Sequence, residues 1–230
     1  MGNIKVKICG LTCTNDVQMC MNLGVDILGF VTEYPLPVPW NMSRAETSSL
    51  LNIVRSPHRS CIVTGGNPEK VIMQAACLRP DMIQLHYKET LEDTIIISDA
   101  LRKLNIDVIK TVPPVIEDRI LQFGTADTEV IVRDLCKTNV YGLLADSRVP
   151  ANASQNGCKL DLEFCSQIIE LSSKPVIIAG GINADNVSGL LAQTGIGFLD
   201  IMTGVESSPG KKDYELLSRL LVSIQDYVRI

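Results

Sequence analysis

Short apolar runs alternate along the chain with segments in which apolar residues recur every three or four positions. Most of the runs are apolar on both faces, which is typical of strands in a buried parallel sheet, and the periodic segments are typical of helices. The eight predicted strands are Lys5–Gly10, Val25–Val31, Cys61–Thr64, Met82–Leu85, Val108–Val112, Gly142–Ala145, Val176–Ala179 and Phe198–Met202. A helical pattern follows each strand, so the sequence predicts an α/β fold, a (β/α)8 TIM barrel. An open doubly wound sheet has the same periodicity and stays as the alternative.

Several helix starts carry capping signals. Ser43 and Asn67 each precede a helical pattern, and the proline after Asn67 suits a first helical turn. Thr12 or Thr14 is expected to cap the first helix, which runs through the apolar positions that follow it. The segment Asp127–Cys136 fits a strand or a helix equally well, because its apolar run is short.

Glycine turns follow the last two predicted strands. Gly180 and Gly181 end one strand, Thr203 and Gly204 end the other, and a helix is predicted to begin within Asn183–Asn186. Glycine lets backbone N–H groups approach an anion closely, and the positive end of a helix favours a phosphate. A Gly-Gly pair alone more often serves a tight turn, but two such turns on neighbouring strands predict a phosphate site.

Composition narrows the class of protein. At 230 residues, with no linker-like segment, the chain is expected to form one domain over residues 1–230. The net charge of −5 and the absence of basic runs argue against a nucleic-acid partner. No apolar run approaches the roughly 18–20 residues of a membrane span, so we expect a cytoplasmic protein with no membrane partner. Its 8 cysteines are then expected to be reduced, and its 2 distant histidines predict no metal site.

Side chains at the carboxyl ends of barrel strands share one mouth. The residues predicted there are Cys9, Thr32, Thr64, His86, Thr111, Asp146, Gly180 and Thr203. A thiol and a carboxyl group on opposite sides of a phosphosugar can act as base and acid, so Cys9 and Asp146 are the candidate catalytic pair. Lys7 lies on the same side of its strand as Cys9 and can favour the thiolate. The plainer interpretations are a small buried apolar residue for Cys9 and a turn cap for Asp146.

Six segments spread over nearly the whole chain resemble the phosphoribosylanthranilate isomerase family of tryptophan biosynthesis. They are KICGLT at 7–12, VDILGFV at 25–31, DMIQLH at 81–86, GLLADS at 142–147, PVIIAGGINADNV at 175–187 and DIMTGVESSPGKKD at 200–213. The resemblance implies a (β/α)8 barrel enzyme that needs no cofactor. The implied reaction is the Amadori rearrangement of N-(5-phosphoribosyl)anthranilate to 1-(2-carboxyphenylamino)-1-deoxyribulose 5-phosphate.

The resemblance also implies roles for individual residues. Cys9 matches the general base and Asp146 the general acid, which opens the ribose ring before the base removes a proton from C2. Asp200 matches a residue that faces the ribose, and the phosphate is implied to sit on the glycine turns. The implied substrate-binding residues are His86, Gly180, Gly181, Asp200, Thr203 and Gly204.

The aryl end of the expected pocket departs from the family. Where the family has Ser-Pro-Arg, whose arginine pairs with the anthranilate carboxylate, this chain has Val38-Pro39-Trp40. An indole has one neutral donor and no charge, so Trp40 cannot replace a guanidinium. Arg44 is the candidate replacement. The family's glycine-rich loop after strand six keeps one of three glycines and its final aspartate, at residues 154–161.

Three interpretations follow from these departures. The first is a true isomerase that meets the carboxylate with Arg44 or another cation. The second is a paralogue that isomerises a different phosphorylated aminosugar, with Trp40 stacked on an uncharged ring. The third is a non-catalytic phosphosugar-binding protein, against which the retention of Cys9 and Asp146 argues. In each case the expected partner is a small phosphosugar, and the expected state is a monomer or homodimer.

Overall fold

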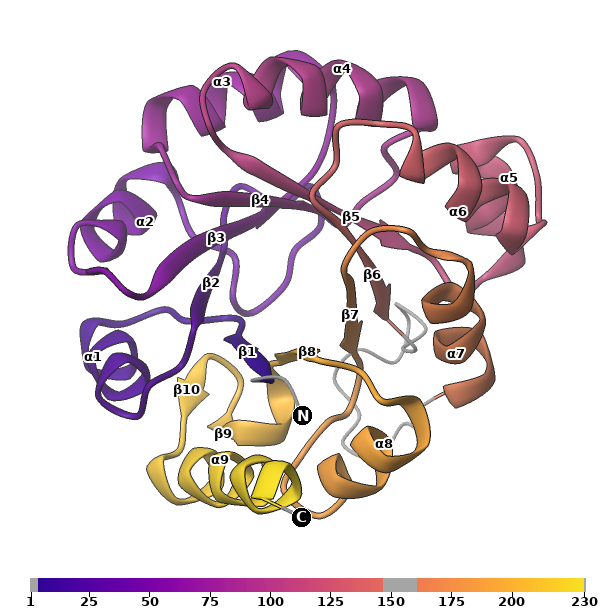
Figure 1. Ribbon diagram of the computed structural model, residues 1–230. Helices are drawn as coiled ribbons and strands as arrows, with labels where there is room; N and C mark the ends of the chain where they lie inside the picture. The colour runs from indigo at the N-terminus through magenta and orange to yellow at the C-terminus, as the bar shows by residue number, and fades with distance from the viewer. Residues whose placement is uncertain (1–3, 147–160, 230) are drawn as a thin grey trace.

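Eight parallel strands form a closed barrel in the order of the chain, and helices surround it (Figure 1). The computed structural model describes residues 4–146 and 161–229. The strands are β1 (Lys5–Ile8), β2 (Ile27–Val31), β3 (Arg59–Thr64), β4 (Met82–Leu85), β5 (Asp107–Val112), β6 (Gly142–Asp146), β7 (Val176–Ala179) and β8 (Phe198–Ile201). Because β1 pairs with β8, from Lys5 opposite Phe198 to Ile8 opposite Ile201, the predicted (β/α)8 barrel is confirmed and the open sheet is wrong.

The helices pack against the outside of the barrel. They are α1 (Thr14–Asn22), α2 (Arg44–Leu51), α3 (Pro68–Leu78), α4 (Leu91–Arg102), α5 (Ile116–Phe123), α6 (Thr128–Cys136), α7 (Leu162–Leu171), α8 (Val187–Thr194) and α9 (Tyr214–Arg229). After β8, a 3₁₀ turn η2 (Thr203–Val205) leads into a small hairpin of β9 (Glu206–Ser208) and β10 (Lys211–Lys212). The ambiguous segment Asp127–Cys136 is thus a helix, capped by the Asp127 side chain.

Most predicted helix starts are confirmed. The Ser43 hydroxyl accepts from the Glu46 amide in a capping box, and the Asn67 side chain accepts from the Lys70 amide. The first helix differs, because its N-cap is Cys13, which makes no side-chain bond to the helix. The Thr12 hydroxyl, which was expected to cap the helix, instead donates to the Gly210 carbonyl at 2.7 Å, on a loop far away in the sequence.

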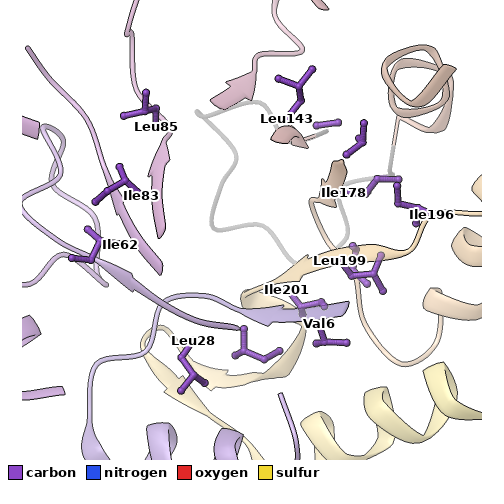
Figure 2. Close-up of a cluster of buried hydrophobic side chains, with 14 of the residues drawn as sticks. Val6, Leu28, Ile62, Ile83, Leu85, Leu143, Ile178, Ile196, Leu199 and Ile201 are labelled. Carbon is purple, nitrogen blue, oxygen red and sulfur yellow. The ribbon is translucent and has the colours of Figure 1, made fainter. Parts of the chain in front are cut away.

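Strand alternation separates two apolar layers. Outward side chains such as Leu28, Ile62 and Leu143 join the helices in a continuous core (Figure 2). Inward side chains, among them Met82 and Phe198, fill the barrel axis. Since the interior is filled, as is usual for this fold, a ligand can enter only beyond the strand ends. The site is therefore confined to the mouth of the barrel.

Candidate active site

A cavity of about 440 Å³ opens at the carboxyl ends of the strands. Its walls include Cys9 after β1, His86 after β4, Asp146 at the end of β6 and Asp200 in β8. The structure thus brings the two predicted catalytic residues, which are far apart in sequence, to the same cavity. His86 and Asp200, predicted to bind substrate, line it as well.

Backbone packing fixes Cys9 at the mouth. Its amide donates to the Ile201 carbonyl at 2.8 Å, which continues the β1–β8 pairing by one residue. A Cβ on Gly29 in β2 would lie 2.9 Å from the Cys9 Cα, so the glycine makes room for the cysteine. Cys9 as a whole is 5% exposed. Burial raises its pKa, and the nearby cations Lys7 and Lys212 oppose that effect only in part.

Lys7 is the cation that was expected beside Cys9, but it is already paired. Its Nζ lies 2.8 Å from Asp200 Oδ2, and the lysine is fully buried. Although burial alone lowers the pKa of Lys7, its carboxylate partner raises that pKa above the usual value, so Lys7 stays charged. Because burial outweighs this cation at Cys9, the net effect of the surroundings is to raise the pKa of the thiol.

Asp146 lies beside an imidazole. His86 Nε2 is 3.6 Å from Asp146 Oδ2. His86 Nδ1 lies 2.9 Å from the Thr111 hydroxyl and 3.2 Å from Gln84 Nε2, and its carbonyl accepts from the Tyr34 hydroxyl at 2.7 Å. These contacts hold the ring next to the carboxyl group. Gln84 and Tyr34 were not predicted as site residues, although Gln84 shares a strand face with His86.

Two buried acceptors at the cavity have no hydrogen-bond partner among the described residues. They are Oδ1 of Asp200 and Oε1 of Gln84, and both residues line the cavity. A buried acceptor without a donor is costly, so these atoms are suited to receive hydroxyl or N–H groups of a ligand.

Trp40 forms part of an aromatic wall. It packs with Cys9 and Val63, and its indole N–H donates to Glu206 Oε1 at 2.8 Å. Lys212 Nζ lies 2.7 Å from the same oxygen, so the carboxylate that holds the indole is itself neutralised. Elsewhere on the wall, the rings of Tyr34 and Tyr87 pack edge to face, with their centroids 6.0 Å apart.

Arg44 does not reach the cavity. It is the first residue of α2, and its guanidinium lies 2.9 Å from Glu33 Oε2 on the preceding loop. Arg44 is absent from the cavity walls. The structure therefore corrects the prediction that Arg44 replaces the missing family arginine, because the Glu33 carboxylate on the loop before α2 already pairs with it.

The two glycine turns lie beside the cavity. Gly180 has φ 109° and Gly181 φ 64°, values that favour glycine. A Cβ on Gly204 would lie 1.9 Å from the Ile182 carbonyl oxygen, so the turns after β7 and β8 pack against each other. Thr203 begins the 3₁₀ turn with Gly204. Their neighbours Ala179 and Met202 line the cavity, whereas Gly180, Gly181, Thr203 and Gly204 are not among its lining residues, and the phosphate site stays a prediction.

The remaining sequence expectations concern metals, disulfides and membranes. In residues 4–146 and 161–229, no group of three or more His, Cys, Asp or Glu side chains is placed to hold a metal ion. The cysteines in this part of the chain are all free. No helix there is long and apolar enough to cross a membrane. The glycine-poor loop predicted at 154–161 lies outside the described residues except for Asp161, which caps α7.

A filled parallel barrel with a thiol, a carboxyl group and an imidazole around one cavity at its carboxyl ends defines a (β/α)8 barrel enzyme suited to acid–base chemistry. A family model described as "N-(5'phosphoribosyl)anthranilate (PRA) isomerase" matches residues 6–222. The chain belongs to this isomerase family.

Individual relatives agree with the family match. The chain is 28% identical to the N-(5'-phosphoribosyl)anthranilate isomerase of Halorubrum lacusprofundi, with 95% of each chain covered. It is also 28% identical to that of Legionella pneumophila, with 96% of this chain and 97% of the relative covered. The phosphoribosyl anthranilate isomerase from Thermotoga maritima shares the fold, with a TM-score of 0.76 at 23% identity over 97% of this chain and 99% of that chain.

A further solved isomerase structure contains a ligand. That protein is in complex with reduced 1-(o-carboxyphenylamino)-1-deoxyribulose 5-phosphate, and it superposes with a TM-score of 0.74 at 21% identity, covering 97% of this chain and 99% of that chain.

Proposed function

We propose that this chain isomerises N-(5'-phosphoribosyl)anthranilate to 1-(2-carboxyphenylamino)-1-deoxyribulose 5-phosphate, a step of tryptophan biosynthesis. The observation that carries the proposal is the placement of Cys9 and Asp146 on one cavity, at the ends of β1 and β6, in a chain that the family model matches over residues 6–222. The complexed relative supports the choice of substrate, because its ligand is the reduced form of the proposed product.

The acid acts first. Asp146 in its protonated form gives a proton to the ring oxygen, the bond from C1 to that oxygen breaks, and the nitrogen lone pair forms a protonated Schiff base. His86, 3.6 Å from the carboxyl group, keeps Asp146 in place for this step. The cavity supplies the positioning that turns a slow rearrangement into a fast one.

Cys9 then acts as the base. Its thiolate takes the proton from C2, and the bonding pair forms the C1–C2 double bond as the nitrogen loses its positive charge. The enolamine tautomerises to the ketone. Although burial raises the pKa of Cys9, a cationic Schiff base beside it favours the thiolate. The thiol therefore ionises best, with its proton passing to water, when the opened substrate is bound.

The ribose hydroxyls and the phosphate of the substrate are assigned to Asp200 and to the glycine turns. Asp200 Oδ1 is free to accept from a ribose hydroxyl, since Lys7 occupies the other oxygen. The phosphate is assigned to backbone groups of Gly180, Gly181 and Gly204 and to the Thr203 hydroxyl, as the paired glycine turns suggest. We further propose that residues 1–230 act as one domain, as a monomer or homodimer, in the cytoplasm. A relative from Thermotoga maritima that is described as dimeric supports the homodimer.

Two single substitutions test the proposal. Cys9→Ala and Asp146→Asn are each expected to lower kcat by about 100-fold or more, because general acid or base catalysis contributes about that much. Binding of the reduced product analogue should change far less. Turnover is followed by the fluorescence of the anthranilate group, and Cys20→Ala, a buried thiol in the outer core, is the matched control. Turnover within a few fold of the wild type in both site variants would refute the assignment.

A further inference from the structure

The proposed substrate carries a carboxylate on its aryl ring, since anthranilate is 2-aminobenzoate. A carboxylate that enters a partly dry cavity loses hydration and needs a cation or several donors in return. The charged residues on the cavity wall are mostly acidic: Asp118, Asp146 and Asp200 all line it. A second anionic group in the ligand therefore requires a specific positive partner.

Most cations around the mouth, within the part of the chain that the structure describes, are already paired with carboxylates. Lys7 is paired with Asp200 at 2.8 Å, Lys212 with Glu206 at 2.7 Å, Lys110 with Glu89 at 3.3 Å and Arg44 with Glu33 at 2.9 Å. Among the described residues that line the cavity, a single lysine or arginine remains, which is Lys88. We propose that Lys88, on the loop after β4, binds the aryl carboxylate of the substrate. This inference rests on the proposed function.

The loop that carries Lys88 is fixed from within. Glu89, the next residue, is fully buried and accepts from the amides of Gly66 at 3.0 Å and Tyr87 at 3.1 Å. Its charge is met by buried Lys110. Because the backbone on both sides of Lys88 is held while its side chain is exposed, the ammonium group can reach into the cavity from a rigid base.

The neighbours of Lys88 suit an aryl ring. Lys88 Nζ lies 5.9 Å from the centroid of the Tyr87 ring, which meets Tyr34 edge to face, and both rings line the cavity. A substrate ring packed against these tyrosines would present its carboxylate to the ammonium group. His86, two residues before Lys88, lies beside the proposed acid Asp146, so this one loop links the reacting end of the site to its aryl end.

The test separates binding of the carboxylate from turnover. Lys88→Gln, Lys88→Arg and the control Lys103→Gln are compared with the wild-type chain. Lys103 is an exposed lysine at the opposite end of α4, away from the mouth. Dissociation constants are measured by calorimetry for reduced 1-(o-carboxyphenylamino)-1-deoxyribulose 5-phosphate and for the same compound without its carboxyl group. Steady-state kinetics with the anthranilate substrate accompany the binding data.

Lys88→Gln is expected to raise the dissociation constant of the carboxylated compound about tenfold, which is the usual effect of losing a hydrogen bond to a charged group. The dissociation constant of the compound without the carboxyl group should stay within about twofold of the wild-type value. The KM should rise by a similar factor at nearly constant kcat. Lys88→Arg should restore most of the affinity, and Lys103→Gln should match the wild type. Equal losses for both compounds, or no loss for either, would overturn the assignment of Lys88. A wild-type chain that binds the compounds but turns over no substrate would refute the proposed function instead.

Discussion

Replacing Lys7 with Met is expected to slow the alkylation of Cys9, whereas replacing Asp200 with Asn is expected to speed it. The two side chains form one buried ion pair at 2.8 Å beneath the thiol. Lys7 lowers the pKa of Cys9 and Asp200 raises it, both against the larger effect of burial. Removing either partner breaks the same pair but leaves the opposite charge near the sulfur, so the two variants should move in opposite directions.

The size of the effect follows from the strand geometry. Lys7 and Cys9 are two residues apart on the same strand face, so their Cα atoms are about 6.6 Å apart, and this spacing is taken as the separation between the ammonium group and the sulfur. At an effective dielectric of about 20, a unit charge at that distance is worth about 2.5 kcal/mol. This energy corresponds to a change of about 70-fold in the thiolate population. Because the remaining charged side chain can move away from the sulfur, we expect a smaller measured change, of about tenfold or more.

The assay is the rate of iodoacetamide labelling of the Cys9 peptide between pH 7 and pH 9, resolved by mass spectrometry. Exposed Cys13 and Cys77, labelled in the same sample, provide the internal reference. Both variants lose a buried partner, which costs about 3–5 kcal/mol of stability, so circular dichroism must first show that each is folded. Changes of equal sign and size in Lys7→Met and Asp200→Asn would refute the electrostatic reasoning, because loss of packing alone would explain them.

Two further substitutions test the walls of the site. Trp40→Phe keeps the aromatic ring but removes the 2.8 Å bond from the indole N–H to a carboxylate, so the free energy of unfolding in urea should fall by about 2 kcal/mol. The exposed control Tyr214→Phe should change it by less than about 0.5 kcal/mol, and an equal effect in both would contradict the role of that bond. Gly204→Ala places a Cβ 1.9 Å from a carbonyl of the neighbouring turn, so calorimetry should show weaker inorganic phosphate binding and a lower Tm. Gly189→Ala, which has open space in α8, should leave phosphate binding unchanged, and a Gly204→Ala variant that binds phosphate as the wild type does would disprove the predicted site.

The positions of the candidate catalytic pair, Cys9 and Asp146, show how much of a site can be predicted from local sequence signals. Four strands lie between Cys9 and Asp146 in the chain, yet each residue directly follows or ends a buried run that the sequence marks clearly. Once the parallel barrel is assumed, their shared mouth follows from topology. The contacts around them do not follow in the same way, since Tyr34 and Gln84 reach His86 through loop and side-chain geometry.

Local pattern determined the elements of this protein. The bounds of β4 and β7 agree residue for residue with the predicted Met82–Leu85 and Val176–Ala179. The reason is that turn residues on both sides of a short apolar run fix where the strand begins and ends. Ser43 and Asn67 cap helices as expected, since a cap depends on residues three positions away. The fold class and the candidate catalytic pair were therefore available from the sequence alone.

Tertiary structure decided which charges are available and which groups are buried. The sequence allowed Arg44 to bind a substrate carboxylate, but in the fold its guanidinium lies 2.9 Å from Glu33. In the same way, the sequence did not show that Lys7 pairs with Asp200 of β8. Burial, which no local pattern measures, raises the pKa of Cys9 despite its lysine neighbour. Ion pairing and desolvation depend on segments far apart in the chain. The sequence could therefore name the charged residues, but only the closed barrel shows that Lys88 is the one lysine or arginine among the described residues of the cavity wall.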